Sequence, residues 1–181
     1  MEKRIIRTIH DLCTSDRGVN PEVLEEVITL AFEIAREGRE GRRVGTMFVV
    51  SDTENTMRRS KSMILDPLAC HAERLKHLED SNLRETVKEL AQLDGAFIVS
   101  DSGIVESACR YIDASSKGIR LPLGLGSRHV AAASITKHTD AIAVVVSESG
   151  IVRVFDDGVL IGEIIPDEWN LHPDDLAQRP Q

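Results

Sequence analysis

Residues 141–165 read AIAVVVSESGIVRVFDDGVLIGEII, and this stretch decides the fold. It contains three runs rich in β-branched residues, separated by the turn sequences Glu148-Ser149-Gly150 and Asp156-Asp157-Gly158. β-Branched residues favour strands, and short turns with glycine favour hairpins. The stretch therefore predicts three consecutive antiparallel strands. The first run is apolar throughout, which predicts a strand buried on both faces.

The same pattern extends toward the N-terminus. Asp101-Ser102-Gly103 separates two apolar runs and predicts another hairpin, with its return strand at 104–112. The run VGTMFVV at 44–50 predicts a further buried strand. Apolar periodicity and helix-end signals predict helices at 2–15, 21–37, 68–78, 82–92 and 128–136, and residues 51–67 are predicted to be irregular.

These elements predict an α/β fold with a mixed, largely antiparallel central sheet that is flanked by helices. A chain of 181 residues fits one main domain, which we place at 44–165. Two helices precede it in an N-terminal segment, 1–43. A polar tail that contains proline, 166–181, follows it.

Composition excludes several classes of protein. With 22 basic and 30 acidic residues the formal net charge is −8, so we expect no nucleic-acid partner. No apolar run approaches the roughly 18 residues that a membrane span needs. The charged N-terminus lacks the apolar core of a signal peptide, so we expect no membrane association and a cytoplasmic protein. The three cysteines form no CxxC pair, which predicts reduced thiols rather than a zinc site.

The segment GLGSRHVAAASIT, residues 124–136, has the features of an anion site. Gly126 lets the backbone approach a ligand, Ser127 could cap the helix, and free N–H groups at a helix start attract phosphate. Arg128 offers a planar fork for phosphate oxygens, and His129 can also donate. The alternative is a capped surface helix. No P-loop motif occurs, and His129 interrupts a GxGxxG pattern.

Two carboxylates lie at the ends of predicted strands. Asp94 precedes one strand within Asp94-Gly95-Ala96, and Glu148 follows the apolar strand at 141–147. Carboxylates together with phosphate oxygens are ligands that Mg²⁺ or Mn²⁺ prefers. The alternative for each residue is an ordinary turn position.

The order of these motifs resembles the diadenylate cyclase (DAC) domain family. Asp94-Gly95-Ala96 is followed about 30 residues later by LGLGSRHVAAASIT and then by TDAIAVVVSESG. The resemblance covers 44–165. It implies a homo-oligomer with facing sites that makes cyclic di-AMP and two pyrophosphates from two ATP. In that reaction each 3′-hydroxyl attacks the α-phosphate of the other ATP.

The resemblance also assigns residues. Asp94, Arg128 and His129 would be catalytic, and Asp94 and Glu148 would hold Mn²⁺ or Mg²⁺. The nucleotide would contact the two residues after Asp94 and the start of the 124–136 segment. That set comprises Gly95, Ala96, Gly126, Ser127, Arg128 and His129.

Val130 departs from the family pattern, because bacterial members usually carry Arg there. Arg58, Arg59 or Lys61 could supply the missing phosphate contact. The SRHV variant predicts an archaeal-type branch. Two other hypotheses stay open: a non-catalytic module that senses ATP or cyclic di-AMP, and a structural α/β interaction domain.

Overall fold

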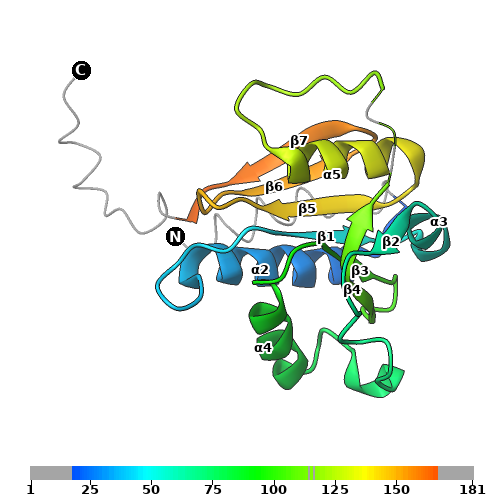
Figure 1. Ribbon diagram of the computed structural model, residues 1–181, viewed down its shortest axis with the longest axis vertical. Coiled ribbons are helices and arrows are strands. Elements are labelled where there is room, and N and C mark those ends of the chain that lie inside the picture. Colours follow the sequence, from blue (N-terminus) through cyan, green and yellow to red (C-terminus); the bar gives the residue numbers. More distant parts are fainter. Residues whose placement is uncertain (1–17, 114, 116, 167–181) are drawn as a thin grey trace.

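The computed structural model describes residues 18–113, 115 and 117–166, and its centre is a seven-stranded mixed sheet (Figure 1). The strand order is β2-β4-β3-β1-β5-β6-β7. β1 and β3 run parallel, and the other neighbouring strands are antiparallel. The strands are β1 Thr46–Val50, β2 Ser60–Ser62, β3 Ala96–Val99, β4 Val105–Ile112, β5 Ile142–Val146, β6 Val152–Asp156 and β7 Val159–Ile164. The predicted fold class is confirmed, including the run of three strands from β5 to β7.

Helices cover both faces of this sheet. They are α2 Pro21–Glu37, α3 Thr53–Arg58, α4 Ser81–Leu90 and α5 Ser127–His138, with one turn of 3₁₀-helix at Glu73–Leu75. In Figure 1, α5 lies on one side of the sheet, and α2 lies on the other. The helix predicted at 2–15 and most of the tail lie outside the described residues. Within the described part of the chain, no helix has the length and apolar character required to cross a bilayer.

The central strands are buried on both faces, because successive side chains alternate between two cores. In β1, Phe48 and Val50 join the core beneath α2 and α4, whereas Met47 and Val49 join the core beneath α5. The residues of β5 divide in the same way. This alternation explains why the strand at 141–147 reads as continuously apolar.

α2 shows how local sequence sets an element of this fold. Asn20 precedes the helix, and its side chain accepts a hydrogen bond of 3.1 Å from the amide of Glu22. Pro21 occupies the first helical position, where its missing N–H costs nothing. The buried face packs on β5 and β6. It comprises Val23, Leu24, Val27, Ile28, Leu30, Ala31, Ile34 and Ala35. α2 therefore shares its core with the sheet, although it falls in the segment 1–43.

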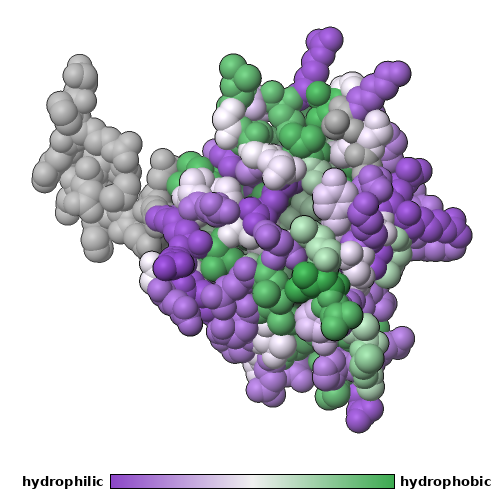
Figure 2. All heavy atoms as spheres, in the orientation of Figure 1, coloured by the Kyte–Doolittle hydropathy of each residue, from purple (hydrophilic) through white to green (hydrophobic). Residues whose placement is uncertain are grey.

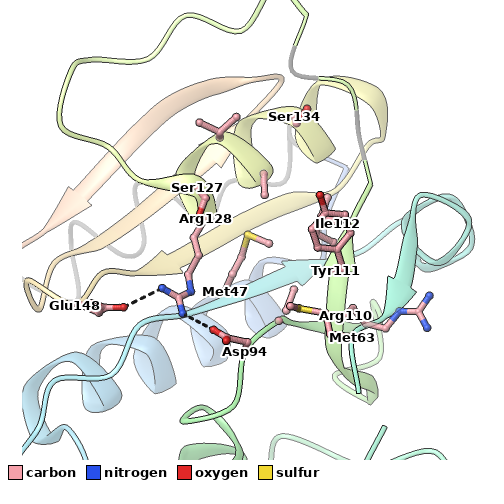
Figure 3. Close-up of a pocket in the computed structure, with 14 residues that line it drawn as sticks. Met47, Met63, Asp94, Arg110, Tyr111, Ile112, Ser127, Arg128, Ser134 and Glu148 are labelled. Atoms are coloured by element: carbon pink, nitrogen blue, oxygen red, sulfur yellow. Dashed lines mark hydrogen bonds and ion pairs between the residues drawn. The ribbon is translucent and has the colours of Figure 1, made fainter. Parts of the chain in front are cut away.

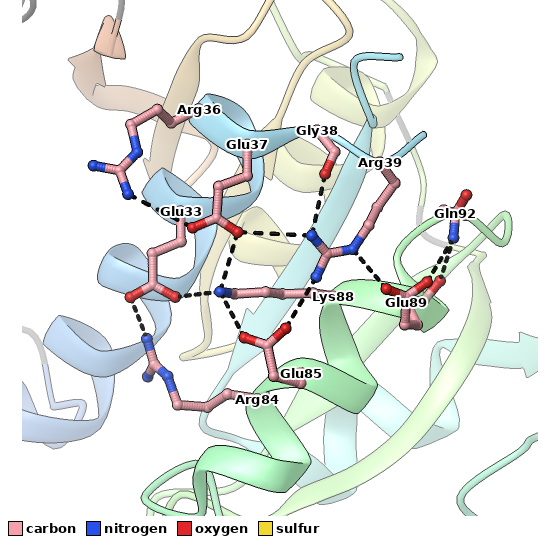
Figure 4. Close-up of polar contacts among 10 residues, drawn as sticks. All are labelled: Glu33, Arg36, Glu37, Gly38, Arg39, Arg84, Glu85, Lys88, Glu89 and Gln92. Atoms are coloured by element: carbon pink, nitrogen blue, oxygen red, sulfur yellow. Dashed lines mark hydrogen bonds and ion pairs between the residues drawn. The ribbon is translucent and has the colours of Figure 1, made fainter. Parts of the chain in front are cut away.

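A cluster of ion pairs connects α2 with α4 (Figure 4). Lys88 of α4 is almost fully buried, and its Nζ lies 3.0 Å from Glu33, 3.3 Å from Glu37 and 2.9 Å from Glu85. Burial lowers the pKa of Lys88, but hydrogen bonds to Glu85 and Glu33 outweigh it, so the pKa lies above its usual value. The ammonium therefore stays charged and holds the two helices together.

The helix predicted at 68–78 is wrong. The segment forms turns and one 3₁₀ turn, because its backbone pairs with the β3–β4 hairpin. The amide of Leu78 donates to Gly103, and the carbonyl of Lys76 accepts from Val105. Asp66 adds a competing contact, because its carboxylate accepts from the amide of Leu68 at 2.9 Å.

The prediction that 51–67 is irregular is also wrong in part. α3 and β2 fall in this segment. β2 forms by antiparallel pairing with the distant strand β4, and the side chain of Arg110 on β4 also donates to the Ser60 carbonyl at 2.8 Å. A three-residue polar strand held in this way has no local pattern that a sequence could reveal.

Candidate functional site

An open pocket of about 710 Å³ lies between the start of α5 and the ends of β1, β3 and β4 (Figure 3). Ligand sites of small-molecule enzymes fall in this size range. The pocket is lined by Met47, Met63, Asp94, Gly95, Ala96, Arg110, Tyr111, Ile112, Ser127, Arg128, Val130, Ala131, Ser134 and Glu148. The structure thus brings together six of the eight residues that the sequence singled out as site candidates.

Arg128 is the centre of the polar wall of this pocket. Its Nη2 lies 3.2 Å from Oδ1 of Asp94, and its Nη1 lies 3.2 Å from Oε1 of Glu148 (Figure 3). Three elements meet here: the turn before β3, the start of α5 and the turn after β5. Both carboxylates are largely exposed, so the pairs are weak and can exchange for other partners.

Gly45, just before β1, makes room for this arrangement. A Cβ at this position would lie 2.9 Å from Nη1 of Arg128 and 3.0 Å from Cγ of Glu148. Sequence reasoning missed Gly45 because its neighbours are far away in the chain. The sequence feature that could have drawn attention to Gly45 is its position immediately before a buried strand.

Gly95 is required by the backbone itself. Its φ is +110°, and a Cβ would lie 2.5 Å from the carbonyl carbon of Cys109. Cys109 also has a positive φ, 55°, and pairing between β3 and β4 shifts register here. The glycine of Asp94-Gly95-Ala96 thus allows an irregular β4 to pass close behind the pocket and leaves Asp94 exposed at its mouth.

The start of α5 presents polar groups to the pocket. Gly126 is the N-cap, and no side chain caps the helix, so the expectation that Ser127 would be the cap is wrong. Ser127 is the first helical residue and lines the pocket, whereas Gly126 is not among the lining residues. The amide of His129 already donates to the Gly126 carbonyl at 3.1 Å, and the amides of Ser127 and Arg128, at the first two helical positions, are the groups that suit this end to an anion.

His129 lies beneath the helix rather than on the pocket wall. It is only 6% exposed, and its ring packs edge-on against Phe155 at 6.1 Å between ring centres. Nε2 lies 3.2 Å from Nη1 of Arg153. Burial lowers the pKa of His129, and the positive charge of Arg153 lowers it further. A hydrogen bond to the backbone of Gly126 acts in the opposite direction but does not outweigh these effects.

Val130 does line the pocket, so the departure from the family pattern lies at the site. The basic residues expected to compensate do not lie there. Arg58 pairs with Glu54, Lys61 lies over the ring of Tyr111, and neither these two nor Arg59 is among the pocket-lining residues. The additional arginine at the pocket is Arg110, whose guanidinium points away toward β2 and bonds to Ser60.

Arg110 and Tyr111 were missed because of the register shifts in the β3–β4 hairpin. Counting back from Val99 and Val105 would place residue 108 opposite Ala96, whereas the structure pairs Ala96 with Arg110. The hairpin turn was readable in the sequence, but the irregular pairing was not.

Asp94 and Glu148 fit a divalent cation in part. The two carboxylates contact the two Nη atoms of one guanidinium, so the positive charge of Arg128 lies between them. The described residues include no group of three or more Asp, Glu, His or Cys side chains that could hold a metal. Mg²⁺-type ions are commonly held by one or two carboxylates, with substrate phosphates and water completing the shell. The donor set fits a metal that binds together with a phosphorylated ligand.

The fold and site define an α/β domain in which the start of a helix and its arginine lie beside two exposed carboxylates at an open pocket. The family model described as DisA bacterial checkpoint controller nucleotide-binding (DAC) matches residues 33–160. The chain belongs to the DAC family.

Similar proteins include two from archaea. A diadenylate cyclase of Methanocaldococcus jannaschii is 49% identical over 160 residues, covering 88% of this chain and 50% of that protein. A diadenylate cyclase of Haloferax volcanii is 37% identical over 171 residues, covering 93% of this chain and 62% of that protein. The chain therefore spans between half and two thirds of these relatives.

Solved structures share the fold. DacA from Staphylococcus aureus, solved as a double mutant, matches with a TM-score of 0.52 and 21% identity, covering 86% of this chain and 93% of that chain. A hypothetical membrane spanning protein from Bacillus cereus matches with a TM-score of 0.52 and 25% identity, covering 74% and 59%.

Proposed function

We propose that this chain is a diadenylate cyclase domain, which condenses two ATP into cyclic di-AMP and two pyrophosphates. The observation that carries the proposal is the convergence of Asp94, Arg128 and Glu148 at one pocket next to the start of α5. Membership of the DAC family and likeness to two archaeal diadenylate cyclases support it.

In this proposal the start of α5 binds the triphosphate. Ser127 offers a hydroxyl, the first-turn amides offer N–H groups, and Arg128 exchanges its carboxylate partners for phosphate oxygens. Gly95 and Ala96 lie against the rest of the nucleotide on the opposite wall. Binding and orientation would then supply most of the catalysis, as in other phosphoryl transfers.

Asp94 and Glu148 would hold the divalent ion, with Asp94 close to the 3′-hydroxyl. Diadenylate cyclases depend on a metal in general, and we propose Mn²⁺ or Mg²⁺ here. When bound, the ion would acidify the attacking hydroxyl and neutralise charge on the phosphates. Moving Arg128 toward the phosphates would free both carboxylates for the ion.

The reaction needs two ATP held face to face. Each 3′-oxygen forms a bond to the α-phosphorus of the other ATP, the bond to the β-phosphate oxygen breaks, and pyrophosphate and one proton leave. Each chain has one Asp94 and one Arg128 and therefore one site. We propose that two copies of the chain supply the two sites.

Exposed apolar side chains beside the pocket support this assembly. Met63 and Tyr111 line the pocket and are about half exposed, and Ile64 and Leu65 follow Met63 in the chain and are exposed. Figure 2 shows apolar side chains gathered in patches among polar ones on this face of the molecule. Grouped exposed apolar residues are typical of interaction surfaces.

The test is product formation from ATP with Mn²⁺ or Mg²⁺, followed by mass spectrometry. We expect the wild type to form cyclic di-AMP and to release one pyrophosphate for each phosphodiester bond formed. Asp94→Asn should abolish it while leaving the fold intact, since it keeps volume but removes the charge. Asp101→Asn, in the remote β3–β4 turn, is the matched control. Normal turnover by folded Asp94→Asn would contradict the assignment.

One observation favours a second candidate, a non-catalytic module that binds ATP or cyclic di-AMP. Val130 gives the pocket an apolar side chain at the position where an arginine would add a phosphate contact. Tight binding without turnover in the same assay would select this candidate.

A further inference from the structure

A line of three side chains connects the last strand of the sheet to the first turn of α5. Oε2 of Glu163, on β7, accepts a hydrogen bond of 2.7 Å from Nε of Arg153, on β6. Nη1 of Arg153 in turn lies 3.2 Å from Nε2 of His129, on α5. His129 directly follows Arg128, so this line ends one residue from the polar wall of the pocket.

The chemistry of the three groups fixes their roles. An arginine can only donate hydrogen bonds, so Nε2 of His129 must accept, and the neutral ring carries its proton on Nδ1. The side chain of Arg153 is only 12% exposed, and a buried guanidinium needs a counter-charge, which Glu163 supplies. The three side chains therefore act as one unit, and each loses its partner if the middle one is removed.

The position of this unit bears on the direction of Arg128. Successive residues of a helix point about 100° apart, so His129 enters the core when Arg128 faces the pocket. Packing of the His129 ring on Phe155 and its bond to Arg153 fix the rotation of this first turn. That rotation decides where Arg128 and the first-turn amides point.

We propose that Arg153 and Glu163 are positioning residues of the nucleotide site. They hold His129, and through it the first turn of α5, in the orientation that aims Arg128 and the free amides at a bound triphosphate. His129 then acts from beneath the helix and does not touch the nucleotide. The inference rests on the proposed function, because it assigns these residues to the same site.

The chain offers a matched control at the other end of α5. Nζ of Lys137 lies 2.9 Å from Oδ1 of Asp157, in the turn between β6 and β7. This pair also ties α5 to the last hairpin, but it does so in the last turn, away from the pocket. Its loss removes a helix–hairpin contact without disturbing the helix start.

The experiment compares Arg153→Lys, Glu163→Gln and Lys137→Gln with the wild type. Binding of a non-hydrolysable ATP analogue with Mg²⁺ is measured by calorimetry, and urea unfolding measures stability. We expect the first two variants to weaken analogue binding about three- to tenfold, and Lys137→Gln to change it by less than about twofold at a similar loss of stability. The ¹⁵N spectrum of the wild type should show His129 protonated at Nδ1.

The outcomes separate this inference from the proposed function. If the wild type does not bind the analogue, both fail. If it binds and both Arg153→Lys and Glu163→Gln bind equally well, the positioning role alone is overturned. Should Arg153→Lys not fold, Glu163→Gln still decides, since Glu163 is the most exposed of the three residues. A His129 ring protonated at Nε2 would also overturn the inference.

Discussion

Arg128→Gln should change the binding of nucleotide and of metal in opposite directions. In the structure the guanidinium bridges Asp94 and Glu148 at 3.2 Å each, where we propose that a divalent ion binds. With ATP, the same guanidinium would turn to the phosphates. The variant therefore loses a phosphate ligand, but it also removes the positive charge that competes with the ion.

The magnitudes follow from the exposure of the groups. A hydrogen bond to a charged group contributes about 1.5–3 kcal/mol, whereas an exposed ion pair contributes roughly 0.2–1 kcal/mol. In the wild type, Arg128 must give up both ion pairs to contact the phosphates, so its net contribution to ATP binding is smaller than the full hydrogen bond. Arg128→Gln should therefore weaken ATP binding by about 1–2 kcal/mol, or roughly 5- to 30-fold in Kd. Without nucleotide, release of both carboxylates should tighten Mn²⁺ binding by about 2- to 30-fold.

Two titrations check this prediction. Mn²⁺ binding is followed by electron paramagnetic resonance in the absence of nucleotide, and ATP-analogue binding is followed by calorimetry. Lys137→Gln, which removes one positive charge from the far end of the same helix, controls for net charge. If Arg128→Gln bound Mn²⁺ more weakly than the wild type, the carboxylates would not be a cation site that Arg128 occupies.

Three further predictions concern other parts of the molecule. Gly95→Ala should lower the free energy of unfolding by roughly 2–4 kcal/mol, because φ is +110° and the new Cβ meets the Cys109 backbone; an unchanged urea midpoint would contradict this. The pKa of His129 is lowered by burial and by the charges of Arg153 and Arg128, which outweigh the opposing effects of a hydrogen bond to the backbone of Gly126 and of the charge of Glu163. The folded state therefore resists protonation, and stability should fall as pH drops below about 6.5, with His129→Gln flattening the curve of urea midpoint against pH. Specific activity should rise with protein concentration if two chains form the reaction centre, and an active monomer in sedimentation at the lowest active concentration would refute that assembly.

Much of the fold could be predicted because it depends on local signals. The three strands after Asp140 follow from alternating turns and β-branched runs, and α2 follows from Asn20, Pro21 and its apolar periodicity. α5 begins one residue earlier than predicted and ends two residues later. Each of these elements has a capping, turn or periodic pattern within its own segment, so the local sequence was sufficient to predict it.

The remaining features depend on contacts between distant residues. β2 exists because it pairs with β4, about 50 residues later, and the segment at 76–78 is not helical because its backbone bonds to the β3–β4 hairpin. At the site, the sequence could indicate Asp94, Arg128 and Glu148 as candidates through the order of motifs. It could not indicate that Arg128 bridges the two carboxylates, because that depends on how two separate turns and the start of α5 meet.

The order of strands in the sheet has a consequence for synthesis of the chain. β1 is fully buried at the centre of the sheet, but one of its two partner strands comes late in the chain. Thr46 of β1 pairs with Val146 of β5, which is 100 residues later. At about 5–20 residues per second, a ribosome completes this partner roughly 5–20 s after β1. β3 can pair with one edge of β1 earlier, but during the whole interval the other edge lacks its partner and is available to other nascent chains. We expect the yield of folded protein to depend on chaperones that shield β1 until β5 emerges.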